Sequence, residues 1–114
     1  MGAWMVREKK TKILLGVFVE DTIARLGEAV SSCSVYRSPL DDVEPDDADP
    51  RDFEYCRINS GGFVNYVFAE EDNPPRLWVD NVMGYTGKFG LYPTGDVIDD
   101  PWEPRWKSFP DRAR

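Results

Sequence analysis

Histidine is absent from this chain of 114 residues. Its imidazole is the usual general base near neutral pH, and the Ser-His-Asp and Cys-His catalytic arrangements both need it. The sequence also has neither a P-loop nor a Gly-x-Gly-x-x-Gly nucleotide fingerprint. Pairs of carboxylates remain the only candidates for acid–base catalysis. Outside the acid-rich residues 39–52, the candidates are Asp80, Asp96, Asp99 and Asp100. We therefore expect a protein that is not an enzyme, with no catalytic residues and no cofactor.

Cysteine is scarce as well, since only Cys33 and Cys56 are present and no Cys-x-x-Cys pair exists. Secreted proteins of this size usually have more disulfides, so we expect two reduced thiols and a cytoplasmic protein, in a bacterium or an infected host cell. No signal peptide is visible, and the longest apolar run, residues 13–19, is too short to span a membrane. Two cysteines cannot complete a usual zinc site, and Asp47 stands where a calcium loop needs glycine. We expect no bound metal and no membrane partner.

Basic residues are too few to balance the acids, with 14 Lys and Arg against 21 Asp and Glu and a net charge of -7. Such a charge repels polyanions, so we expect no direct binding of nucleic acid. Prolines 39, 45 and 50 interrupt the region where the acids gather, which predicts a long acidic loop over residues 39–52. The acidic residues there are Asp41, Asp42, Glu44, Asp46, Asp47, Asp49, Asp52 and Glu54.

The length suits one domain spanning residues 1–114. Residues 1–10 are predicted to be a polar lead-in anchored by Trp4. The apolar, β-forming run of residues 11–19 predicts a buried strand that is central in the sheet or next to central.

The next segment has the spacing of an amphipathic helix. Apolar side chains recur at helical intervals over residues 21–33, and Asp21 can cap the free amides of the first turn. A short strand is expected within residues 34–38. The helix and the strands together indicate an α+β fold, with one helix packed on a four- to five-stranded, mostly antiparallel sheet.

Further strands are predicted in the second half of the chain. Residues 53–59 and 63–70 flank a glycine turn and resemble a hairpin, and residues 76–83 would add a third strand to make an antiparallel meander. Another short strand is expected near residues 88–92.

The last segment, residues 97–109, has five large apolar side chains despite its prolines, so we predict a packed, extended tail. Trp102 and Trp106 either pin this tail to the domain or anchor an interface, because Trp is enriched in binding hot spots. Tyr85, in a glycine-rich segment, is likewise part of a plain connection or of a binding loop.

The charge pattern favours binding and inhibition of another protein that has a basic surface. The predicted partner-binding residues are Asp41, Asp42, Glu44, Asp46, Asp47, Asp49, Asp52, Tyr85, Trp102 and Trp106. In size, acidity and lack of histidine the chain resembles bacterial toxin immunity proteins and small phage inhibitors of host defences. That resemblance implies a toxin or a nucleic-acid-handling defence complex as the partner. An assembly subunit, as a homo-oligomer or virion component, and a nucleic-acid mimic are the alternative functions.

Overall fold

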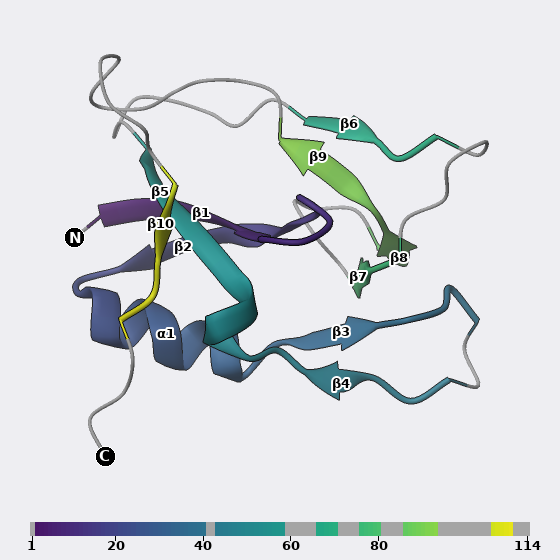
Figure 1. Ribbon diagram of the computed structural model, residues 1–114, viewed down its shortest axis with the longest axis horizontal. Coiled ribbons are helices and arrows are strands. Elements are labelled where there is room, and N and C mark those ends of the chain that lie inside the picture. Colours follow the sequence, from purple (N-terminus) through teal and green to yellow (C-terminus); the bar gives the residue numbers. More distant parts are fainter. Residues whose placement is uncertain are drawn as a thin grey trace.

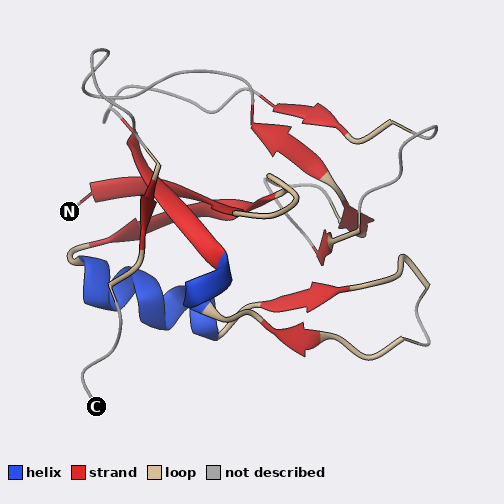
Figure 2. Cartoon of the chain, viewed as in Figure 1, coloured by secondary structure: helices blue, strands red, loops and turns tan. Residues whose placement is uncertain are grey.

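The computed structural model describes residues 2–40, 43–58, 66–70, 76–80, 86–93 and 106–110. In these ranges the chain forms antiparallel strands and one α-helix (Figures 1 and 2). The α+β class with antiparallel pairing is therefore confirmed. The prediction of one sheet is wrong, because the described strands divide into sheets of four, four and two strands.

Sheet 1 contains β10 (Lys107–Ser108), β5 (Phe53–Ile58), β1 (Gly2–Glu8) and β2 (Leu14–Glu20), in that spatial order. The predicted polar lead-in is thus wrong, because β1 pairs with β2 on one side and with β5 on the other. Its charged end concealed this central position in the sequence.

The apolar run after β1 forms a strand as predicted, but β2 lies at the edge of sheet 1 within the described part of the chain. The unpredicted strand β1 takes a central place, and β2 lies next to it, one of the two positions expected for the run. The first half of β2 is buried, whereas Val17 and Val19 are 41% and 58% exposed.

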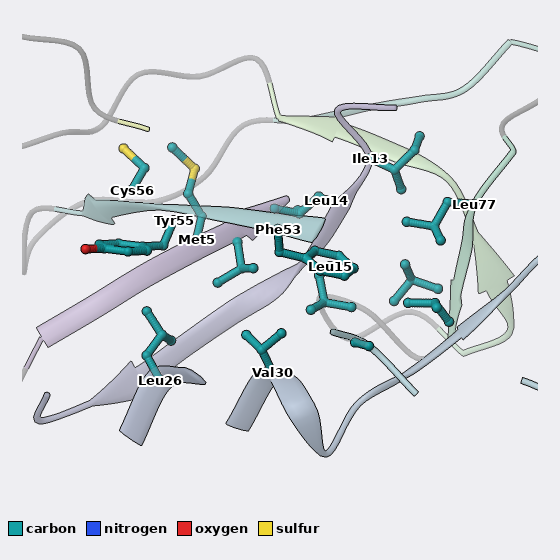
Figure 3. Packing of buried hydrophobic residues seen from close by; sticks show 14 of the residues in the cluster. Met5, Ile13, Leu14, Leu15, Leu26, Val30, Phe53, Tyr55, Cys56 and Leu77 are labelled. Atoms are coloured by element: carbon teal, nitrogen blue, oxygen red, sulfur yellow. The ribbon is translucent and has the colours of Figure 1, made fainter. Parts of the chain in front are cut away.

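The predicted helix is present as α1 (Ile23–Ser31). Its cap is Thr22 and not Asp21, since the Thr22 side chain accepts a hydrogen bond from the Arg25 amide at 3.1 Å. Leu26 and Val30 are fully buried and point from the helix toward sheet 1 (Figure 3).

Sheet 2 contains β4 (Asp46–Asp47), β3 (Ser34–Tyr36), β7 (Trp78–Asp80) and β8 (Lys88–Phe89). The predicted strand at 34–38 is confirmed by β3. The predicted loop at 39–52 needs correction, because it contains β4 and the 3-10 helix η1 (Pro50–Asp52). Pairing with β3 gives β4 extended structure despite its two neighbouring carboxylates.

Sheet 3 pairs β6 (Tyr66–Phe68) with β9 (Leu91–Pro93). The predicted meander is therefore wrong, since β5, β6 and β7 lie in three different sheets. The single strand predicted near 88–92 is two strands, β8 and β9, separated at Gly90.

One hydrophobic core joins the three sheets and the helix (Figure 3). The end of the predicted tail contributes to it, because Phe109 is buried with its ring centroid 4.9 Å from that of Tyr55. Trp106 packs at the margin of the same core. Residues 97–105 of that prediction lie outside the described residues. Within the described ranges, no helix has the length and apolar character needed to cross a membrane.

Candidate partner-binding surface

The acidic segment, defined as described residues 43–52, is held to the fold at several points. Asp46 and Asp47 pair with Val35 and Ser34 of β3. The next residue, Ala48, is buried and its amide donates to the Cys33 carbonyl at 3.0 Å. These contacts fix the position of carboxylates that an unstructured loop would leave free to move.

Two acids of the segment are engaged internally. Asp49 caps η1 by accepting from the Arg51 amide at 3.0 Å, and its carboxylate meets the Arg51 guanidinium at 2.9 Å. Hydrogen bonds from Arg51 lower the pKa of Asp49 below its usual value. Asp46 lies 3.7 Å from the Arg37 guanidinium, a looser pair. Asp49 therefore stabilises its own turn and is the acid least suited to a partner.

The remaining described acids of the segment, Glu44, Asp47 and Asp52, are exposed. None of the three makes an ion pair with another described residue. Their charges are thus open to a basic group from outside.

The strand register joins Asp47 to residues that the sequence analysis did not select. Directly opposed residues of an antiparallel pair share a face, and alternate residues along a strand do so too. Val35 and Val79 are opposed to each other and buried, so their face points to the core. The residues that alternate with these along the strands point away from the core and form the outer face of sheet 2. They are Ser34, Tyr36, Asp47, Trp78, Asp80 and Lys88.

Two aromatic side chains lie side by side on β3 and β7, the two middle strands of that outer face. Tyr36 and Trp78 are directly opposed, and both are partly exposed. Asp80 lies two residues beyond Trp78 on β7, and Asp47 is opposed to Ser34, two residues before Tyr36 on β3. Both carboxylates are exposed and lie on the same side of the aromatic pair, and the Tyr36 hydroxyl donates to Asp80 Oδ2 at 3.5 Å. The outer face therefore combines two aromatic rings with two carboxylates.

A cation already lies on this face. Lys88 Nζ is 4.3 Å from the centroid of the Tyr36 ring and donates to the Leu40 carbonyl at 2.8 Å. An ammonium above an aromatic ring is attracted by the negative face of the ring. The contact demonstrates that the geometry of this face suits a positive group.

The other predicted contact residues do not add to this surface. Asp41, Asp42, Tyr85 and Trp102 lie outside the described residues. Trp106 precedes β10 in sheet 1, where the Arg7 guanidinium lies 3.9 Å from its ring centroid. The structure therefore places Trp106 against sheet 1 and not beside the acidic segment.

Glu8 is the one buried acid among the described residues, at 5% exposure. It accepts a hydrogen bond from Thr11 Oγ1 at 2.7 Å and lies 3.8 Å from the Arg37 guanidinium. These partners explain its burial, because a buried carboxylate must be paired and hydrogen-bonded. Its position at the end of β1, next to the β1–β2 turn, gives it a structural role.

Both cysteines are free thiols. Burial raises the pKa of Cys33, which keeps its thiol protonated and poorly nucleophilic near neutral pH. Cys56 is fully buried. Among the described residues, no cluster of three or more acids or cysteines is arranged to hold a metal ion.

Comparison with known proteins identifies no relative: no family model, no curated protein and no solved structure matches this chain. Its function must be inferred from the surface itself.

Proposed function

We propose that this protein binds and inhibits another protein through a basic surface of that partner, which meets the outer face of sheet 2. The observation that carries the proposal is the Tyr36–Trp78 pair, opposed on neighbouring strands, with the exposed carboxylates of Asp47 and Asp80 in the next row of the same face.

The chemistry of this face suits arginine in particular. A guanidinium stacks on an aromatic ring and at the same time donates hydrogen bonds to a carboxylate. Trp78 offers the ring, and Asp80 on the same strand and face offers the carboxylate. Trp, Tyr and Arg are the residues most enriched in binding hot spots, and the rim of an interface is usually polar.

The charge of the whole protein supports the same kind of partner. A net charge of -7 attracts a basic protein from a distance and speeds the encounter. Glu44 and Asp52, exposed elsewhere on the acidic segment, extend the negative charge beyond the outer face.

In this proposal the protein acts in the cytoplasm by binding its partner and does not catalyse a reaction. It is supported by the absence of histidine, by the free thiols and by the raised pKa of Cys33. A toxin neutralised by an immunity protein, or a nucleic-acid-handling defence complex blocked by a phage inhibitor, has the basic surface that this face requires.

The test uses basic proteins captured from a bacterial lysate at low salt, followed by measurement of their association rates. Asp47→Lys and Asp80→Lys each reverse one charge on the outer face. Glu28→Lys is the matched control, because Glu28 is exposed on α1 and its reversal changes the net charge equally.

We expect either outer-face variant to slow association by roughly tenfold or more and to abolish inhibition of the partner, since both encounter and docking need these charges. Glu28→Lys should slow association only slightly. Equal slowing by all three variants would show that net charge alone governs binding, and the proposal for the outer face would be wrong.

A further inference from the structure

Among the described strands, the edge of β2 that faces away from β1, called here the free edge of β2, differs from the other edges of the two four-stranded sheets. The edge strands β4, β8 and β10 have two residues each, and each contains at least one charged residue. Short, charged edge strands are a common protection against pairing with another chain. β2 has seven residues, and its only charge is Glu20 at its end.

This edge is also accessible. Val17 and Val19 are 41% and 58% exposed, and they are among the most exposed large apolar residues described. Within the described residues, β2 pairs with β1 alone. From Val17 to Glu20 the backbone makes no hydrogen bond to a described strand other than β1. In an edge strand, alternate amides and carbonyls point away from the paired neighbour, where a new strand can pair with them. The Glu20 carbonyl also accepts a hydrogen bond from the Trp4 indole at 3.4 Å.

We propose that two copies of this chain associate by antiparallel pairing of their β2 strands, with a two-fold axis at Phe18. Phe18 then faces its own copy in the other chain, and Val17 faces Val19. Gly16 faces Glu20. The two four-stranded sheets become one continuous sheet across the axis.

A second copy fits this edge because the strand is complementary to itself. The cross-strand pairs nearest the two-fold axis are all apolar, and pairs of aromatic or β-branched residues stabilise a sheet. The charged Glu20 faces Gly16, which has no side chain to compete for space. The two Glu20 residues stand about 14 Å apart, four residues at about 3.4 Å each. That separation exceeds the Debye length of about 8 Å at physiological salt, so their repulsion is screened.

The proposed dimer has a distinctive dependence on salt. Its interface is formed by apolar side-chain contacts and by backbone hydrogen bonds. Each copy has a net charge of -7, and this like charge opposes association. Added salt screens this repulsion, so dimerisation should strengthen as salt is raised. A dimer in which the basic ends of one copy contact the acidic middle of the other would instead weaken as salt is raised.

The test measures oligomeric state by sedimentation from about 1 µM to 1 mM, the range in which weak complexes become half-formed. Val17→Lys and Val19→Lys place a charge on the proposed edge. Val67→Lys is the matched control, because Val67 is 50% exposed on β6. Circular dichroism confirms that every variant is folded.

We expect the wild type and Val67→Lys to dimerise, and each β2 variant to weaken dimerisation by roughly tenfold or more, because an edge lysine opposes strand pairing. A wild type that stays monomeric throughout the range, or a dimer unaffected by Val17→Lys and Val19→Lys, would overturn the proposal. Partner binding is separable, since these variants leave the outer face of sheet 2 unchanged.

Disulfide trapping tests the register, in a background with Cys33→Ser. A mixture of Val17→Cys and Val19→Cys proteins should cross-link under mild oxidation, because directly opposed Cα atoms lie within disulfide range. Val17→Cys alone should cross-link poorly, since its two copies are diagonal neighbours about 7–8 Å apart. Equal cross-linking in the mixture and in the single variant would contradict the two-fold axis at Phe18.

Discussion

At the scale of single residues, Lys12 shows where the backbone departs from its preferred conformation. It lies in the turn between β1 and β2 with φ of 65°, the only non-glycine residue with positive φ in the described part of the chain. This left-handed conformation disfavours a side chain with a Cβ atom. Its amide donates to the Glu8 carbonyl at 2.9 Å, so the turn is held closed despite the strain.

Lys12→Gly should therefore raise the free energy of unfolding by about 0.5–1 kcal/mol, because glycine removes the strain and this exceeds its entropic cost. The contact of Lys12 with Glu54 at 3.6 Å is lost, but Glu54 keeps its closer pair with Arg7 at 2.6 Å, so the loss should cost little. Urea unfolding measures the change. Lys10→Gly is the control and should destabilise, since Lys10 has no positive φ to relieve. A destabilised Lys12→Gly would show that the turn depends on the lysine side chain.

At the scale of elements, α1 contains a glycine that the helix does not require. Gly27 is buried, and a Cβ atom added there would lie 3.8 Å from the Phe109 ring, an ordinary van der Waals distance. Alanine is the stronger helix former because it loses less backbone freedom on folding. The interior of α1 thus has room for a methyl group at this position.

Gly27→Ala should stabilise the protein by about 0.5–1 kcal/mol, as measured by thermal or urea unfolding. Gly87→Ala is the contrasting variant and should destabilise, because Gly87 has a φ of 112° that a side chain rarely adopts. If Gly27→Ala lowered stability, the packing of Phe109 against α1 would have to be tighter than the structure shows.

Local elements of this fold follow from local patterns, whereas their partners do not. Helical spacing predicted α1 and β propensity predicted β3, because both signals lie within a few residues. Strand β5 was predicted as half of a hairpin, yet it pairs with β1, whose residues lie far away in the sequence. The strand β1 was missed because Glu8, the charged residue at its end, is buried with Thr11 and Arg37 as its partners. Arg37 follows β3 and reaches Glu8 only in the folded protein.

The candidate site was partly predictable for the same reason. The density of acids indicated Asp47 and its neighbours directly. Tyr36 and Trp78 became part of the surface only through the pairing of β3 with β7, two strands that lie far apart in the sequence. No local pattern around either aromatic residue indicates that the other one is its neighbour.

At the scale of the whole molecule, two surfaces have different physical characters. The outer face of sheet 2 is acidic and aromatic, and its proposed binding weakens as salt screens the attraction. The free edge of β2 is apolar, and its proposed pairing strengthens with salt. A salt titration therefore separates the two associations in one sample, with opposite directions of change.

The most direct test of the central claim is a nuclear magnetic resonance titration of the protein with a short arginine-rich peptide. We predict the largest shifts at the Trp78 indole and at the amides of Asp47 and Asp80, with the Trp78 indole assigned through Trp78→Phe. Asp47→Lys should reduce these shifts and Glu28→Lys should preserve them. Shifts confined to residues away from sheet 2, or equal reduction by both variants, would contradict the claim that this face receives a basic partner.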